Sequence, residues 1–128
     1  NNGGALGVGV SGDSVTPALV QGTQDVIGVS AGHYQSCFIT SVGPLLCAGR
    51  NWHGELGIGV ISDTYHYTPE AVSGLTAGVD ISTWGGYIGT TCAALADGTA
   101  WCWGYGGDGG LADEIYAHRY TPYPVAGF

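Results

Sequence analysis

The stretch VDISTWGGYIGTTCAALADGTAWCWGY, from Val79 to Tyr105, decides the fold because the chain contains it twice. The other copy, VIGVSAGHYQSCFITSVGPLLCAGR, runs from Val26 to Arg50, and its two cysteines lie 55 residues before their counterparts. Both copies consist of short apolar runs separated by Gly, Pro, Asp or Asn, without a helical period. This pattern predicts β-strands and turns, and hence an all-β protein.

Two shorter phrases show that the whole chain is a repeat array. TPALVQG, TPEAVSG and TPYPVAG begin 52 and 53 residues apart, and NNGGALG, NWHGELG and GGDGGLA place Leu6, Leu56 and Leu111 in register. A period near 50 residues is typical of four-stranded propeller blades. We therefore predict about two and a half blade units, which are residues 1–50, 51–105 and the partial unit 106–128.

The strands should follow the apolar runs. Asp97-Gly98 predicts a two-residue hairpin turn, because both turn positions favour positive φ, and Val42-Gly43-Pro44 forms a looser counterpart. The expected strands are Ala18–Val20, Val26–Ser30, Ser36–Thr40, Leu45–Ala48, Ala71–Val72, Val79–Thr83, Thr91–Leu95, Ala100–Trp103 and Tyr123–Val125.

The cysteines are placed symmetrically about these turns, so the two members of each pair should face each other across antiparallel strands. Opposed Cα atoms in such a ladder lie roughly 4.5 to 5.5 Å apart, which a disulfide can bridge. We expect disulfides between Cys37 and Cys47 and between Cys92 and Cys102. The alternative is two buried free thiols in each hairpin. Disulfides indicate a location outside the cytoplasm, in the extracellular space or at the cell surface.

Charge is sparse and negative. Only 9% of the residues are charged, Arg50 and Arg119 are the only basic residues, and the net charge is −8. Such a field repels phosphates, so we expect no binding to nucleic acid or to anionic membranes. The chain has no apolar run long enough to insert into a membrane. Either its many Gly, Thr, Ser and Tyr residues keep the surface soluble, or a neighbouring subunit or O-linked sugar covers part of it.

The repeated phrases resemble a known family. V-x-x-V-S-A-G, A-D-G-T-A-W-C-W-G, N-x-x-G-x-L-G and T-P-x-x-V-x-G are similar to repeats of the regulator of chromosome condensation family, a seven-bladed propeller. The cysteine-bearing form looks like its secreted bacterial branch. The first unit departs from the pattern at Gly43-Pro44 and Ala48-Gly49. The resemblance implies guanine-nucleotide exchange or protein binding, but this chain lacks the basic extensions, so exchange is only a remote alternative.

The loops before Thr-Pro are the most suggestive surface. Tyr and Arg are typical contact anchors, and aromatic faces also stack on sugars, so these loops predict a protein or glycan site. The alternative is that the rings pack against the next blade. The candidate binding residues are Tyr65, His66, Tyr67, Tyr116, His118, Arg119 and Tyr120.

Other chemistries have little support in the sequence. The four histidines are scattered, which disfavours a zinc site. Asp108, Asp113 and Glu114 in GGDGGLADE resemble calcium-binding glycine-aspartate repeats, but one copy is more simply a glycine-rich loop with solvated carboxylates. No nucleophile elbow, phosphate loop or dinucleotide fingerprint occurs. We therefore expect no cofactor, no metal and no catalysis.

The expected function follows from the repeat. Each blade buries its apolar face only against a neighbour, and two and a half units are fewer than the roughly four to eight blades that close a propeller. We expect a secreted, non-enzymatic structural module whose main partner is more of the same protein, joined in a ring or filament. The alternative is a fragment of a longer secreted propeller that binds a protein or glycan through its loops.

Overall fold

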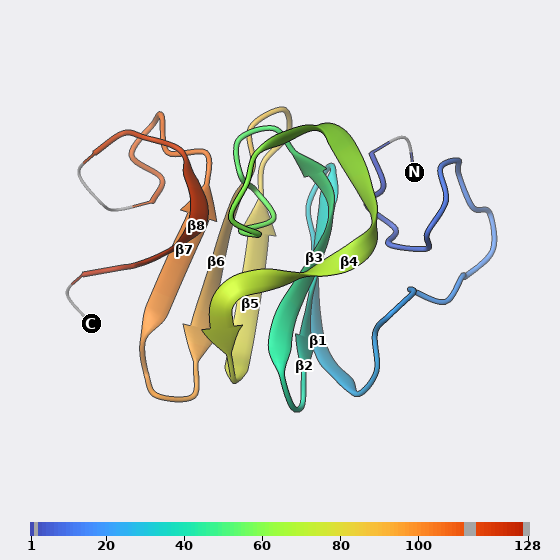
Figure 1. Cartoon of the computed structure of the whole chain (residues 1–128), viewed down its shortest axis with the longest axis horizontal. Coiled ribbons are helices and arrows are strands. Elements are labelled where there is room, and N and C mark those ends of the chain that lie inside the picture. The colour runs from blue at the N-terminus through green and yellow to red at the C-terminus, as the bar shows by residue number, and fades with distance from the viewer. Residues whose placement is uncertain (2, 112–114, 127–128) are drawn as a thin grey trace.

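Two antiparallel four-stranded sheets stand side by side and make up the fold (Figure 1). The structure is a computed structural model that describes residues 1, 3–111 and 115–126. No helix of the described chain is long or apolar enough to cross a membrane. The strands are β1 (Val26–Ala31), β2 (Gln35–Thr40), β3 (Pro44–Asn51), β4 (Ser62–Thr76), β5 (Gly78–Trp84), β6 (Thr90–Leu95), β7 (Ala100–Gly104) and β8 (Arg119–Pro124).

The sheets have the same order, β1-β2-β3-β4 and β5-β6-β7-β8, and the same register at the cysteines. Cys37 pairs with Cys47 and Cys92 pairs with Cys102 in the ladders, and both pairs form disulfides. The fourth strand of each sheet comes from the following sequence unit, so β8 in residues 106–128 completes the second sheet.

Three details differ from the sequence-based expectation. Ala18–Val20 is not a strand, because no strand of the described chain lies beside it to form a ladder. β4 is far longer than the expected Ala71–Val72 and is irregular, with bulges opposite β3. The second hairpin closes through Gly98 N donating to Leu95 O at 3.0 Å, and only Gly98 has positive φ. Asp97 therefore does not adopt the positive φ expected of it.

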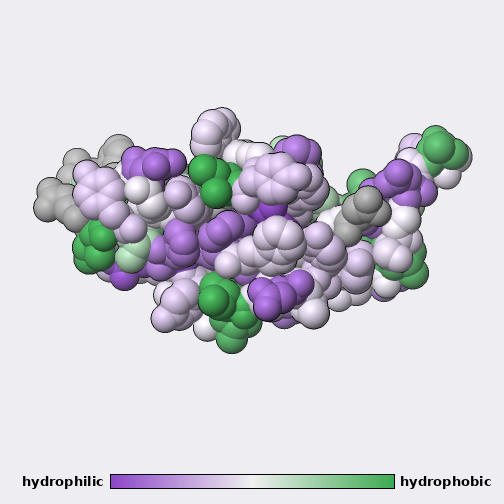
Figure 2. Space-filling view, turned by 90° about the horizontal axis from the view of Figure 1, so that it is seen from above, coloured by the Kyte–Doolittle hydropathy of each residue, from purple (hydrophilic) through white to green (hydrophobic). Residues whose placement is uncertain are grey.

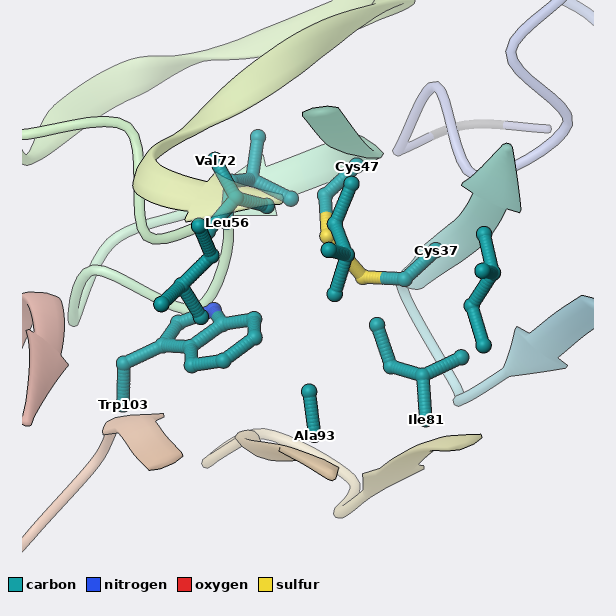
Figure 3. Close-up of a cluster of buried hydrophobic side chains, with 10 residues drawn as sticks. Cys37, Cys47, Leu56, Val72, Ile81, Ala93 and Trp103 are labelled. Atoms are coloured by element: carbon teal, nitrogen blue, oxygen red, sulfur yellow. A yellow bond between two sulfur atoms is a disulfide. The ribbon is translucent and has the colours of Figure 1, made fainter. Parts of the chain in front are cut away.

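Each sheet has a face that carries its disulfide, here called the disulfide face, and an opposite face. The disulfide face of the first sheet packs on the opposite face of the second sheet, and the hydrophobic core lies between them (Figure 3). The first sheet contributes Cys37, Ile39, Leu45 and Cys47, and the second contributes Ile81, Ala93 and Trp103. Trp103 is the largest of the fully buried side chains in the described chain.

A loop between β3 and β4 seals the interface. This inner wedge, residues 51–59, is closed by two hydrogen bonds of the Asn51 side chain, from Leu56 N to Oδ1 (3.1 Å) and from Nδ2 to Val60 O (2.7 Å). Gly57 needs positive φ, and a Cβ there would lie 2.7 Å from the indole nitrogen of Trp103. The wedge therefore places fully buried Leu56 between the sheets.

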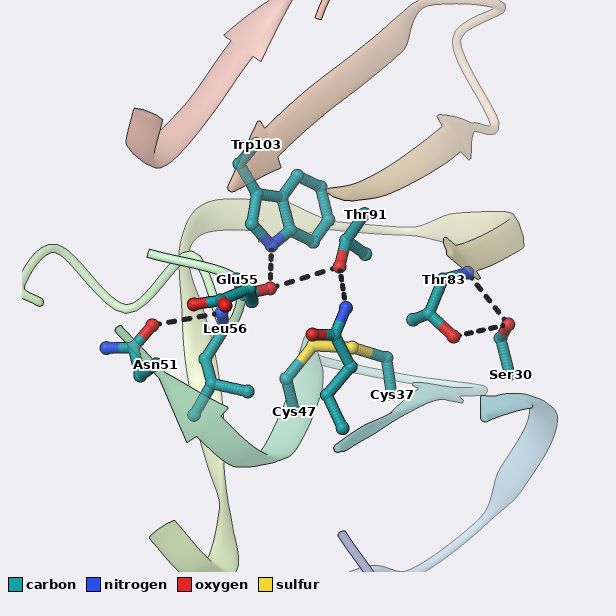
Figure 4. The surroundings of a disulfide bond; sticks show 10 residues. Ser30, Cys37, Cys47, Asn51, Glu55, Leu56, Thr83, Thr91 and Trp103 are labelled. Carbon is teal, nitrogen blue, oxygen red and sulfur yellow. Dashed lines mark hydrogen bonds between the residues drawn. A yellow bond between two sulfur atoms is a disulfide. The ribbon is translucent and has the colours of Figure 1, made fainter. Parts of the chain in front are cut away.

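Polar side chains lock the wedge to the second sheet (Figure 4). The Glu55 carbonyl oxygen accepts from Trp103 Nε1 at 2.9 Å and from Thr91 Oγ1 at 3.0 Å, and Gln35 Nε2 donates to Thr91 Oγ1 at 2.9 Å. Thr91 and Gln35 are almost completely buried, so these bonds satisfy groups that would otherwise destabilise the core. Elsewhere in the interface, Ser30 Oγ lies 3.0 Å from Thr83 Oγ1.

Candidate binding surface

The loops that follow β1, β3, β5 and β7 meet along one edge of the two sheets, the upper edge in Figure 1. Seen from above in Figure 2, this edge is mainly pale and purple, with hydrophobic residues scattered over it. Two aromatic residues of these loops are exposed, Tyr87 by 73% and Trp52 by 40%, and such side chains offer flat faces together with polar groups. The upper edge therefore has the composition of a contact surface for polar or amphipathic partners.

Arg50, at the end of β3, organises the centre of this edge. Its guanidinium carbon lies 4.8 Å from the ring centre of Tyr34 and 4.9 Å from that of Trp52. Its Nη2 donates to Glu55 Oε1 at 3.3 Å, to Gly86 O at 3.2 Å and to Tyr87 O. Arg50 and Glu55 are both buried, so each charge is balanced by the other. Arg50 thus connects the first sheet to the loop after β5 and positions the aromatic rings. Its charge is already paired with that of Glu55.

The candidates Tyr65, His66 and Tyr67 lie within β4, beside the inner wedge. The Tyr65 ring is 6.1 Å from the Trp52 ring and 6.3 Å from the Tyr67 ring, measured between centroids. All three candidates are half-buried, whereas Trp52 is 40% exposed. Part of this group therefore packs within the fold, and Trp52 carries its accessible surface.

His66 also takes part in a chain of hydrogen bonds along β4. Its Nε2 lies 2.7 Å from Ser62 Oγ and its Nδ1 lies 2.5 Å from Glu70 Oε1. In serine hydrolases, a serine nucleophile, a histidine base and an orienting carboxylate are hydrogen-bonded in this same order. Acyl transfer also needs donors preorganised for an oxyanion, and Ser62 Oγ is within 3.1 Å of a second acceptor, the Thr64 carbonyl. We interpret the chain as a brace for the bulged strand.

The candidates from the third unit form a second group. The His118 ring lies 4.9 Å from the His53 ring and 4.8 Å from the Tyr105 ring. Arg119, in β8, holds its guanidinium 4.2 Å from the ring centre of Tyr123. The other two candidates are largely exposed, and they are Tyr116 (67%) and Tyr120 (51%).

The inner wedge brings the two groups of candidates together. Trp52 stacks on Tyr65 from the first group, and the next residue, His53, contacts His118 from the second. Sequence reasoning missed this bridge. The available signal was a departure from the repeat, because Trp52 and His53 occupy positions that hold Asn2 and Gly3 in the first unit.

The structure describes only part of the glycine-aspartate segment GGDGGLADE. Asp108 is exposed in the loop before β8, and Asp113 and Glu114 lie outside the described residues. Among the residues that the structure describes, no three His, Cys, Asp or Glu side chains are grouped so that they could hold a metal ion.

Comparison with known proteins identifies the architecture. No protein-family model and no curated protein matches the chain. Among solved structures, Saccharomyces cerevisiae Prp20p matches at 18% identity and a TM-score of 0.71, covering 98% of this chain and 33% of Prp20p. The two sheets share the fold of RCC1-type β-propeller blades.

Two further structures agree with this assignment. Yeast RCC1 (Prp20) bound to Kap60 matches at 20% identity with a TM-score of 0.72, covering 98% of this chain and 32% of that chain. Human WBSCR16 matches at 19% identity with a TM-score of 0.68, covering 98% and 33%. The chain thus spans about a third of the length of these RCC1-type propellers, and at such identities the likeness concerns the fold.

Proposed function

We propose that this chain is a non-enzymatic extracellular assembly and binding module whose end faces are covered by further propeller blades. Two disulfides support a location in an oxidising compartment. Yeast Prp20p, which shares the fold, has binding properties toward Gsp1p and histones, and Kap60 binds it too. A protein-binding role therefore has precedent in this architecture, although the partners need not be shared.

The observation that carries the proposal is the contrast between two equivalent faces. The disulfide face of the first sheet is covered, and both Cys37 and Cys47 are fully buried. The disulfide face of the second sheet is open: Trp84 is 74% exposed beside a cavity of about 240 Å³ that reaches Cys92. A blade array stabilises such faces by stacking.

Light scattering of the purified protein tests the proposal. We expect particles several times heavier than the 13.0 kDa chain, either a ring of defined mass or a filament of variable mass. Trp84→Arg should shift the distribution toward lighter species, because a charge on the covered face must be desolvated. A compact monomer that unfolds cooperatively and stays monomeric at high concentration would contradict the assembly role.

The upper edge supports a second candidate function, recognition of a protein or glycan through its loops. The specific observation is the exposed Trp52 ring, held between Arg50 and Tyr65. Such a prearranged aromatic surface loses little conformational entropy on binding. Binding to an array of glycans and extracellular proteins, compared between the native chain and Trp52→Ala, tests this function. Ligands that bind both forms equally would exclude Trp52 as the anchor.

A further inference from the structure

The Thr-Pro phrase of the second unit lies in a bulge of β4, the last strand of the first sheet (Figure 1). His66 pairs with Gly49 and Glu70 pairs with Cys47, so β4 takes four steps where β3 takes two. Thr68-Pro69 lies between these pairs. A β-bulge leaves its extra residues outside the ladder and re-aims their side chains. The phrase therefore does not serve the pairing of β4 with β3.

β8 has the same bulge at the phrase of the third unit. Arg119 pairs with Gly104 and Tyr123 pairs with Cys102, so β8 also takes four steps where β7 takes two. Thr121-Pro122 lies between these pairs. The two sheets thus present the same dipeptide at the same place on their fourth strands.

The fold uses the backbone and the proline of each bulge. Gly9 N donates to Tyr67 O at 2.8 Å, and Gly59 N of the inner wedge donates to Tyr120 O at 2.8 Å. These two carbonyls belong to the residues just before the threonines, and the prolines just after the threonines are half-buried. Proline suits a bulge because it has no N–H that would need a partner in the ladder.

The threonine hydroxyls are the part of each phrase that the fold does not use. Thr68 and Thr121 are exposed, and neither hydroxyl makes a hydrogen bond with the part of the chain that the structure describes. By contrast, the hydroxyls of Thr40, Thr90 and Thr91 each donate to a backbone carbonyl. A β-branched valine would suit the strand equally well, so strand geometry does not account for the hydroxyl.

Neighbouring blades leave both threonines accessible. The sheet of Thr68 carries the other sheet on its disulfide face, and the sheet of Thr121 carries the other sheet on its opposite face. Both side chains are exposed all the same. Because the two sheets are equivalent, a blade on either face of a sheet does not cover the bulge. Further blades stacked in the same way would leave both hydroxyls open to solvent.

We propose that Thr68 and Thr121 are acceptors for O-linked sugar. Threonine next to proline is typical of O-glycosylated segments, and proline keeps the residue before it extended, as an acceptor segment must be to enter a transferase. A separate glycosyltransferase uses a sugar joined through its anomeric carbon to the phosphate of a nucleotide or lipid. The bond from that carbon to threonine Oγ1 forms, and its bond to the phosphate breaks with the electron pair leaving on the phosphate. The hydroxyl proton passes to a base of the transferase.

Charge favours a sugar over a phosphoryl group on these hydroxyls. A phosphoryl group adds roughly 1.5 to 2 negative charges to a chain whose net charge is already −8, and Glu70 is only two residues after Thr68. A neutral sugar adds no charge and hydrates a surface on which only 9% of residues are charged. The inference rests on the extracellular location in the proposed function, but it does not need the assembly role.

Peptide mapping of the protein isolated from the cells that produce it tests the proposal. Mass spectrometry of the peptides that contain Thr68 or Thr121 should find each heavier than its sequence by whole sugar units. Fragmentation that preserves side-chain modifications should place the added mass on these two threonines. Mild alkaline elimination should remove it and leave a dehydrated threonine, which is the signature of an O-linked group.

Substitutions made in the same cells provide matched controls. Thr68→Val and Thr121→Val should each lose the sugar of one peptide and keep that of the other, whereas Thr68→Ser retains a hydroxyl and should keep the sugar. Thr64→Val and Thr76→Val are the controls, because both threonines are exposed and neither precedes proline. These two variants should keep both sugars, and circular dichroism should show that all the variants are folded.

The outcomes separate this inference from the proposed function. Peptides with unmodified masses, sugar only on threonines that do not precede proline, or phosphate in place of sugar would each overturn the inference. Heavy particles in light scattering with both peptides unmodified would overturn the inference and leave the assembly role standing. A glycosylated protein that stays monomeric would support the inference and contradict the assembly role.

Discussion

Replacing Trp103 should reveal how much of the stability resides in the contact between the two sheets. The side chain is fully buried against the inner wedge, and its indole N–H donates to Glu55 O at 2.9 Å. Truncating a buried aromatic side chain to alanine costs about 3 to 5 kcal/mol, and the lost hydrogen bond adds about 1 kcal/mol. Trp103→Ala should therefore lower the free energy of unfolding by about 4 to 6 kcal/mol, a large share of the roughly 5 to 15 kcal/mol by which domains are stable.

Urea unfolding followed by circular dichroism measures this loss. Trp103→Phe retains most of the apolar surface and should lose much less, which keeps the experiment informative if the alanine variant does not fold. Trp84→Ala is the matched control, because Trp84 is 74% exposed, and below the assembly concentration it should change stability by no more than about 0.5 kcal/mol. A loss below about 1 kcal/mol for Trp103→Ala, or equal losses for both tryptophans, would refute the described interface.

Three other predictions concern the hairpin, acid stability and charge. Replacing both Cys92 and Cys102 by Ser should lower the free energy of unfolding by about 2 to 3 kcal/mol, because the sequence separation of 10 closes a short loop; calorimetry showing no loss would indicate that the bond is absent in solution. Hydrogen bonds from the hydroxyl and backbone N–H of Thr99 hold the pKa of Asp97 below its usual 3.8. This contribution to stability is present above the unfolded-state pKa and is lost as the pH falls through the lower folded-state pKa. The difference in free energy of unfolding between the native protein and Asp97→Asn should therefore shrink below about pH 4. A difference that does not change with pH would contradict this role of Asp97. Finally, duplex DNA and anionic vesicles should not bind at any salt concentration, given the net charge of −8, and a salt-sensitive shift in either binding assay would disprove this.

The repeat made much of the fold predictable from the sequence. Seven expected strands correspond to parts of the seven strands from β1 to β7, because alternating apolar runs and turn residues mark them directly. The expected strand Tyr123–Val125 overlaps β8. The disulfide partners followed from the symmetry of each hairpin. These features depend on local patterns, which a single sequence records.

Features that depend on distant contacts were not predictable in the same way. β4 extends to 15 residues because β3 offers a ladder along which it can bulge, and the part of its sequence before Ala71, with Pro69 and His66, gives no strand signal. Ala18–Val20 has a strand-like sequence but no neighbour in the described chain. The ring contacts of Trp52 and His53 arise only when the inner wedge folds between the sheets. The boundaries of the units 1–50, 51–105 and 106–128 remain a prediction from the repeat.

The offset between sequence units and sheets has a consequence for how such arrays can evolve. Each sheet takes three strands from one unit and its last strand from the next. A gene duplication that copies a single unit therefore inserts the last strand of the preceding sheet together with the first three strands of a new sheet. Every sheet then remains four-stranded. Recombination in the loops after β3 and β7 can thus lengthen or shorten the array by whole blades without leaving an unpaired edge between them.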